Sequence, residues 1–100
     1  LADIDGLASL TTVGNDLRIY SNDSLADIDG LASLTTVGGS LSIYSNDWLT
    51  DIDGLSSLTT VVNNLNIADN SFLCQSYVDA LIASVSIGGS TNTTGNNTRC

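Results

Sequence analysis

The sequence predicts a β-solenoid in which three 24-residue coils share a parallel sheet and a disulfide-linked helical cap closes the C-terminal end. Three observations support this prediction. Residues 1–24, 25–48 and 49–72 repeat one another, with 20 of 24 positions identical between the first two units and 14 of 24 between the second and third. Apolar residues recur mostly at every third position, which suits a coil that turns corners. The remaining segment, 73–100, does not repeat and holds both cysteines.

Seven apolar positions are the same in all three units and define the predicted core. Each recurs 24 and 48 residues later, and in the first unit they are Leu1, Ile4, Leu7, Leu10, Val13, Leu17 and Ile19. Apolar residues alternate with polar ones at Leu17-Arg18-Ile19, Leu41-Ser42-Ile43 and Leu65-Asn66-Ile67, so we expect the parallel sheet there. One unit buries too little apolar surface to offset the entropy of ordering its chain. Each unit therefore needs neighbours on both sides.

The segment that follows the repeats is predicted to cap the C-terminal end. Ser76 to Val85 fits an amphipathic helix, and its residues expected to face the last repeat are Val78, Leu81, Ile82 and Val85. Cys74 and Cys100 bracket the segment, and an even cysteine count predicts one disulfide, worth about 3 to 4 kcal/mol by the loop-entropy estimate. A disulfide in turn predicts an extracellular or cell-surface location.

The first unit begins in mid-pattern with no helical or charged lid over its apolar residues. A repeat array needs its terminal apolar cross-section covered. We therefore expect either self-association through the uncapped N-terminal unit or covalent continuation of a longer array.

The composition argues against several classes of function. Eleven aspartates face only two arginines, and the net charge of −9 opposes contact with nucleic-acid phosphates. No long apolar run indicates a signal peptide or a membrane span. Histidine and glutamate are absent, and both cysteines are expected to be paired, so no nucleophile lies beside a base. We expect a protein that is not an enzyme and needs no cofactor.

The pattern Leu41-x-Ile43-x-x-Asn46-x-x-Leu49-x-x-Ile52-x-x-Leu55 resembles the leucine-rich repeat consensus, and the resemblance covers residues 1–72. A Leu-x-Ile strand after a Val-Gly-Gly turn, and the glycine of Ile-Asp-Gly-Leu, look closest to the receptor L-domain-like branch of extracellular repeats. The resemblance implies an internal asparagine ladder, in which side-chain amides satisfy backbone groups in the turn after each strand. Its members would be Asn22, Asn46 and Asn70.

The outward strand positions are candidates for a ligand-binding face. The residues at these positions are Arg18, Tyr20, Ser42, Tyr44, Asn66 and Ala68. Tyr20 and Tyr44 are expected to stack, which suits a sugar or peptide ligand but equally fits plain packing between strands. Trp48 and Phe72 share one column and are expected to pack on each other, with contact to a neighbouring molecule as the alternative.

Each unit also carries an Asp-Ile-Asp-Gly segment, whose paired carboxylates resemble part of a calcium loop. The candidate ligands are Asp3, Asp5, Asp27, Asp29, Asp51 and Asp53. Further oxygen ligands are missing and the isoleucine between each pair is expected to point inward. Solvated acidic columns are therefore favoured over a weak calcium site, and no metal is predicted.

Three sequons for N-linked glycans begin at Asn22, Asn92 and Asn96, all in expected turns or in the polar C-terminal segment. Glycans are therefore possible partners. Columns of threonine, such as Thr11 and Thr12 with their repeats, could carry O-linked sugars or simply reflect β-propensity.

Two functional classes fit these observations. The first is a structural or adhesive extracellular repeat protein that could stack end to end into a fibre. The second is a sugar- or peptide-recognition module of a cell-surface leucine-rich repeat protein, since the outward residues Arg18, Ser42 and Asn66 differ while the core stays fixed. Ice or mineral binding by the threonine columns is a third and less favoured alternative.

Overall fold

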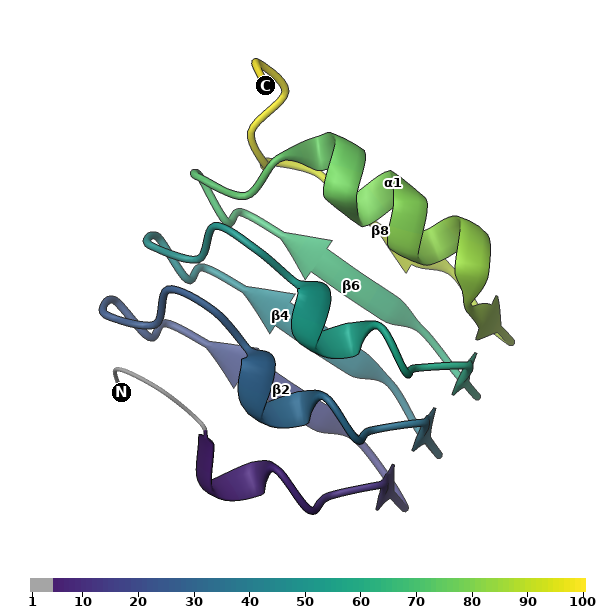
Figure 1. The fold of residues 1–100 in the computed structure, drawn as a ribbon. Helices are drawn as coiled ribbons and strands as arrows, with labels where there is room; N and C mark the ends of the chain where they lie inside the picture. The colour runs from purple at the N-terminus through teal and green to yellow at the C-terminus, as the bar shows by residue number, and fades with distance from the viewer. Residues whose placement is uncertain (1–4) are drawn as a thin grey trace.

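A computed structural model describes residues 5–100 and contains two parallel four-stranded sheets (Figure 1). In one sheet, with the order β1-β3-β5-β7, the strands are Thr12–Val13, Thr36–Val37, Thr60–Val61 and Ser86–Ile87. In the other sheet, with the order β2-β4-β6-β8, they are Leu17–Tyr20, Leu41–Tyr44, Leu65–Ala68 and Thr91–Asn92. The second sheet is the predicted one, and its parallel pairing is confirmed. The short strands at the Thr-Val pairs were not predicted.

Strand register follows the sequence repeat. Thr12 pairs with Thr36, and Leu17 pairs with Leu41, so identical residues stack 24 positions apart. The last step differs, because Leu65 pairs with Thr91, which lies 26 positions later. The repeated strand and turn pattern is compatible with a solenoid-like repeat fold.

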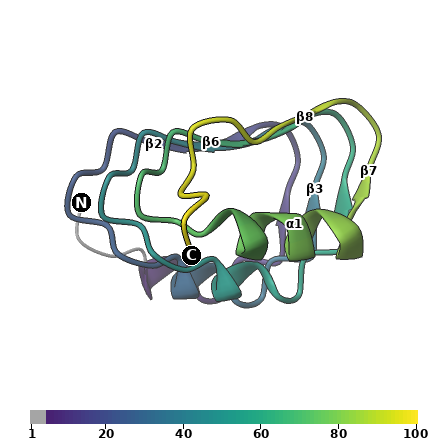
Figure 2. The same ribbon diagram turned by 90° about the horizontal axis from the view of Figure 1, so that it is seen from above.

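Short helices lie across from the longer strands, and Figure 2 shows the layer of β2, β4, β6 and β8 opposite the layer of helices. Three are 3-10 helices, η1 at Asp5–Leu7, η2 at Asp29–Leu31 and η3 at Asp53–Leu55. In η3, Gly54 permits the second and third units to stack closely. A Cβ on Gly54 would overlap the carbonyl oxygen of Ile28 in the preceding unit. Any larger residue there would push η2 and η3 apart.

The predicted core residues of the second and third units are confirmed. Leu31, Leu34 and Val37 are fully buried, and their third-unit equivalents are at most 3% exposed. The side chains of the first unit pack against this core, and several of them stay partly exposed to solvent. Leu1 and Ile4, the first two predicted core residues, lie outside the described residues.

Residues 73–100 hold the predicted helix and also extend both sheets. The helix α1 spans Gln75–Ser84 and buries Val78 and Leu81, whereas Ile82 is only partly buried. The predicted helix end at Val85 is wrong by one residue, because Val85 is already extended as the chain turns into β7 (Ser86–Ile87). Val85 nevertheless packs in the core.

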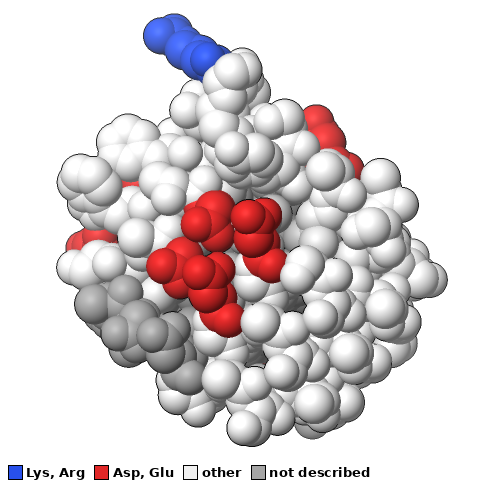
Figure 3. Space-filling model, in the orientation of Figure 1, with Lys and Arg blue, Asp and Glu red and all other residues white. Residues whose placement is uncertain are grey.

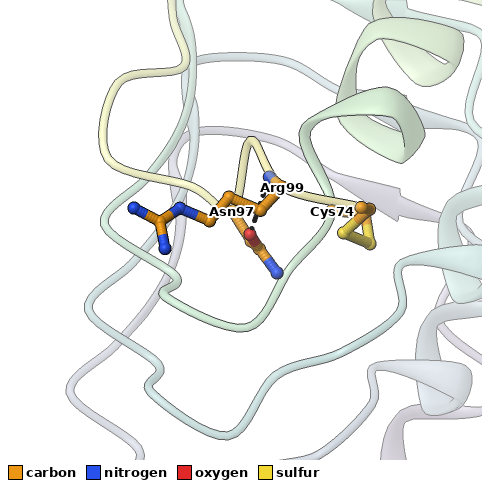
Figure 4. Close-up of a disulfide and its surroundings, with 4 residues drawn as sticks. Cys74, Asn97 and Arg99 are labelled. Atoms are coloured by element: carbon orange, nitrogen blue, oxygen red, sulfur yellow. Dashed lines mark hydrogen bonds between the residues drawn. A yellow bond between two sulfur atoms is a disulfide. The ribbon is translucent and has the colours of Figure 1, made fainter.

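The predicted disulfide between Cys74 and Cys100 is present, with the two Cα atoms 5.7 Å apart (Figure 4). Asn97 lies beside it. The Gln75 backbone N–H donates to the Asn97 carbonyl at 2.7 Å, and the Asn97 N–H donates to the Leu73 carbonyl at 2.7 Å. The C-terminal strand segment is thus held by backbone bonds as well as by the cystine. Within residues 5–100, no helix has both the length and the apolar character needed to cross a membrane.

Candidate functional site

The turn after each long strand contains an asparagine ladder. The backbone N–H and the Nδ2 of Asn46 both donate to Oδ1 of Asn70, at 3.1 and 3.3 Å. Nδ2 of Asn46 also donates to the carbonyl of Ile19 at 3.0 Å, across the unit interface. Asn22 donates in the same way to Oδ1 of Asn46. The structure therefore brings together Asn22, Asn46 and Asn70, the three residues that the sequence placed in the ladder.

A fourth ladder member, Asn96, was missed by the sequence analysis. Its Oδ1 accepts two bonds from Asn70, and its Nδ2 donates to the carbonyls of Ile67 and Thr93 at 2.7 and 3.0 Å. Asn96 is only 8% exposed. A glycan replaces one N–H of this enclosed nitrogen, so the interpretation of Asn96 as a glycan site does not fit this packing. The ladder asparagine does recur in the last unit, but Asn96 follows Asn70 by 26 residues instead of 24, so the 24-residue period does not reveal it.

The backbone before each ladder asparagine is left-handed. Positive φ angles of 55°, 57° and 56° occur at Ser21, Ser45 and Asp69, and Gly95 has a φ of 81°. This conformation disfavours residues other than glycine. At Gly95 a Cβ would also meet the side chain of Asp69. The ladder bonds compensate for the unfavourable backbone by satisfying the polar groups of the turn.

Another corner of each unit carries a second side-chain column that was not predicted. The Ser40 N–H donates to Oδ1 of Asp16 at 2.8 Å, the Asn64 N–H to Oγ of Ser40 at 3.3 Å, and the Ser90 N–H to Oδ1 of Asn64 at 3.0 Å. Each side chain accepts from the next unit. The sequence signal was the recurrence of short hydrogen-bond acceptors, one per unit, at one register position.

The first unit presents an open surface, which we call the N-terminal face and define by Leu7, Leu10, Val13 and Leu17. Leu7 is 40% exposed, whereas its equivalents Leu31 and Leu55 are fully buried. The other three residues of the face are partly buried. The apolar cross-section that each inner unit hides is therefore partly open here.

The outer face of the β2-β4-β6-β8 sheet holds the ligand candidates. Register places Arg18, Ser42 and Asn66 in one row with Asn92, and Tyr20 in line with Tyr44. The two tyrosine rings stack with centroids 5.0 Å apart and planes 4° from parallel. The stack covers one face of each ring, which reduces the aromatic surface that remains for a ligand.

The other residues on or near this face differ in their contacts and burial. Arg18 contacts Asp16 at 3.5 Å in an exposed ion pair, which contributes little to stability. Ala68, in line with Tyr44, is buried. Oδ1 of Asn66 is buried without a hydrogen-bond partner among the described residues. Trp48 and Phe72 pack on each other at 5.3 Å, as expected, yet both stay half-exposed.

Acidic side chains form a patch in the view of Figure 3, which has the orientation in which Figure 1 shows the short helices. Oδ1 of Asp27 accepts the Asp29 N–H at 3.1 Å, and Oδ1 of Asp51 accepts the Asp53 N–H at 3.3 Å. Among residues 5–100 no group of three or more carboxylates or cysteines has the proximity to hold a metal ion. Asp27 and Asp51 thus each bind the backbone N–H of the first residue of a 3-10 helix, whereas the N-cap residues Ile28 and Ile52 make no side-chain cap bond. Asp3 and the side chain of Asp5 fall outside the description.

A shallow cavity of about 290 Å³ lies between η3 and α1. Its floor is apolar and its rim carries one carboxylate and three hydroxyls, and the lining residues are Ile52, Asp53, Ser56, Tyr77, Ala80, Leu81 and Ser84. This cavity was not predicted from the sequence. Its only signal was Ser56, which replaces the alanine found at positions 8 and 32.

The two remaining sequon asparagines have different surroundings. Asn22 is half-buried and donates its amide to Asn46. Asn92 is exposed in β8, and its Oδ1 accepts bonds from the N–H and the hydroxyl of Thr94 at 3.3 and 3.1 Å. The structure thus separates three sequons that look alike in the sequence.

Comparison with protein-family models, with curated protein sequences and with solved structures finds no match for this chain. The resemblance to leucine-rich repeats therefore rests on the sequence pattern alone.

Proposed function

We propose that this chain is a non-enzymatic extracellular repeat protein, similar to a leucine-rich-repeat β-solenoid, with a structural or adhesive role, and that it associates with a second copy of itself through the N-terminal face. The observation that carries the proposal is the contrast between Leu7 at 40% exposure and the fully buried Leu31 and Leu55. Covering apolar surface is favourable in proportion to its area.

The sequence repeat supports a copy of this chain as the partner. The N-terminal face presents the same side chains as the face of the second unit that the first unit covers. The N-terminal face is flanked by strands β1 and β2, each of which pairs on one side only among the described strands. A second chain that brings its own N-terminal face would cover both the apolar residues and these strand edges.

The C-terminal end offers less to a partner, which bears on the fibre hypothesis. Thr91 occupies the register position of the buried Leu65, and the disulfide ties the final segment back to α1. An open fibre needs this end to accept the N-terminal face of the next copy. The polar C-terminal unit therefore favours a closed pair over a fibre.

The test is the mass of the 100-residue protein in solution over a range of concentrations, by sedimentation velocity. We expect concentration-dependent association for the unmodified chain and a monomer for Leu7→Asp. The control is Val62→Asp, which makes the same change at a residue of 48% exposure away from the N-terminal face and should associate normally. A monomer at every concentration for the unmodified chain contradicts the proposal. Electron microscopy of the associated material distinguishes pairs from fibres.

A second candidate function is sugar or peptide recognition on the outer sheet face. The specific observation in its favour is the stacked pair of the exposed Tyr20 and the half-buried Tyr44, on the sheet that also carries Asn66. Oδ1 of Asn66 is buried and unpartnered within the described chain. Screening on a glycan array, with Tyr20→Ala as the comparison, tests it. Binding that survives Tyr20→Ala unchanged would place the ligand elsewhere.

A further inference from the structure

We propose that Asn92 is the N-glycan acceptor of this protein and that the attached glycan covers the free edge of the β2-β4-β6-β8 sheet. The inference goes beyond self-association but shares with the proposed function an extracellular location. Its starting point is the exposure of Asn92 in β8, the last strand of that sheet.

The first step compares the amide nitrogens, since a glycan occupies one N–H of the acceptor. The two N–H groups of Asn96 Nδ2 are shared among three acceptors, the carbonyls of Ile67 and Thr93 and Oε1 of Gln75. Nδ2 of Asn22 donates to Oδ1 of Asn46 at 3.2 Å. Nδ2 of Asn92 donates none to the described residues. Attachment at Asn96 must therefore break at least one of these bonds, and attachment at Asn22 would leave a half-buried nitrogen with one N–H for its ladder bond. Asn92 is exposed, and attachment there disturbs no ladder bond.

The second step concerns the carbonyl oxygen of the same side chain. Oδ1 of Asn92 accepts the Thr94 N–H at 3.3 Å and the Thr94 hydroxyl at 3.1 Å. Two donors on an amide oxygen draw electron density from the nitrogen and ease the loss of its proton. The hydroxyl that defines the sequon therefore already contacts its asparagine here.

The chemical step requires a lipid-linked oligosaccharide diphosphate as donor and a transferase that acts on exported chains. The bond between Nδ2 of Asn92 and the anomeric carbon of the sugar forms. The bond from that carbon to the diphosphate oxygen breaks, and the lipid diphosphate leaves with the electron pair. The Nδ2 proton passes to a base of the transferase.

The position of Asn92 gives the glycan a structural consequence. A free strand edge presents unpaired backbone groups that can pair with another chain. Asn92 is one of the two residues of β8, and that strand pairs only with β6 among the described strands. A bulky glycan there would shield the C-terminal sheet edge, whereas the N-terminal face at the other end of the array would stay open.

The experiment secretes the chain from a eukaryotic cell line that N-glycosylates and measures the intact mass of the folded fraction before and after endoglycosidase treatment. Three matched variants each remove one sequon hydroxyl and leave all asparagines in place, namely Ser24→Ala, Thr94→Ala and Thr98→Ala. We expect one glycan in the unmodified protein, its complete loss in Thr94→Ala, and no change in the other two. Glycopeptide mapping then assigns the site.

Two results overturn the inference: an absence of glycan from the unmodified folded protein, or a glycan lost in Ser24→Ala or Thr98→Ala instead of Thr94→Ala. Self-association is measured separately on the same samples. Glycosylated protein and the Thr94→Ala variant should associate equally through the N-terminal face. Failure of self-association with an intact Asn92 glycan would therefore contradict the proposed function alone.

Discussion

The two ends of the described chain differ in how much apolar surface they expose. At the C-terminal end, Thr91 replaces a core leucine, a ten-residue helix replaces a 3-10 turn, and a disulfide closes the segment. At the N-terminal end, the residues of the N-terminal face keep the apolar identity of an inner unit, yet Leu7 is 40% exposed. The C-terminal unit thus differs from the repeats in sequence and structure, whereas the first unit keeps the apolar residues that the second and third units bury.

A repeat sequence alone therefore does not show which of its units are covered by neighbours on both sides. Leu7, Leu31 and Leu55 are the same residue in the same Asp-Gly-Leu turn, and only the presence of a neighbouring unit separates their burial. Four predictions test how far the two ends differ.

The first prediction compares one substitution at two equivalent positions. Leu55→Ala should lower the free energy of unfolding by about 2 to 5 kcal/mol, because it leaves a cavity in a fully buried site. Leu7→Ala should cost about 1 kcal/mol or less in the monomer, since its side chain is already partly hydrated. Urea denaturation at low protein concentration measures both. Equal losses would mean that the N-terminal face is covered in the monomer.

The second prediction concerns the closure of the C-terminal unit. Reduction of Cys74–Cys100 should lower the free energy of unfolding by about 3 kcal/mol, by the loop-entropy estimate. Denaturation with and without reductant measures the change. Hydrogen exchange should then show residues of α1 losing protection before those of β4 (Leu41–Tyr44). Uniform loss along the chain would contradict a local closing role.

The third prediction compares two members of the asparagine ladder. Asn70→Ala should cost about 2 to 3 kcal/mol, because it removes the acceptor of the buried Asn46 N–H and a bond to the Ile43 carbonyl. Asn22→Ala should cost about 1 kcal/mol or less, since Asn22 is half-buried and accepts no bond from a described unit. Thermal unfolding of the two variants gives the comparison. A larger loss for Asn22→Ala would reverse the assigned ends of the ladder.

The fourth prediction converts the terminating unit toward a continuing one. Thr91→Leu restores the leucine found at the paired position of β6 (Leu65–Ala68) and should change monomer stability by only about 0.5 kcal/mol, because position 91 is exposed. Its effect should appear in assembly, as larger oligomers in sedimentation velocity. Thr91→Ser serves as the polar control. Unchanged assembly in Thr91→Leu would show that the helix and the disulfide terminate the array without help from Thr91.

The sequence alone determined the features that follow from its period. Identical residues at 24-residue intervals fall in register when units stack, so the parallel pairing of Leu17 with Leu41 and the stacking of Tyr20 on Tyr44 could be predicted. The cystine followed from two cysteines that bracket the single unrepeated segment. These features depend on the spacing of residues along the chain, which can be read from the sequence.

Only the tertiary structure decided the features that depend on which groups meet across units. Two additional residues in the last unit carry Asn96 into the ladder and hide it from a 24-residue alignment, although its sequon resembles that of the exposed Asn92. One carboxylate of each acidic pair, Asp27 or Asp51, accepts the backbone N–H two residues later, a contact that depends on the local fold. Burial and hydrogen-bond partners depend on neighbours in space, and within residues 5–100 a preceding unit covers Leu31 but not Leu7.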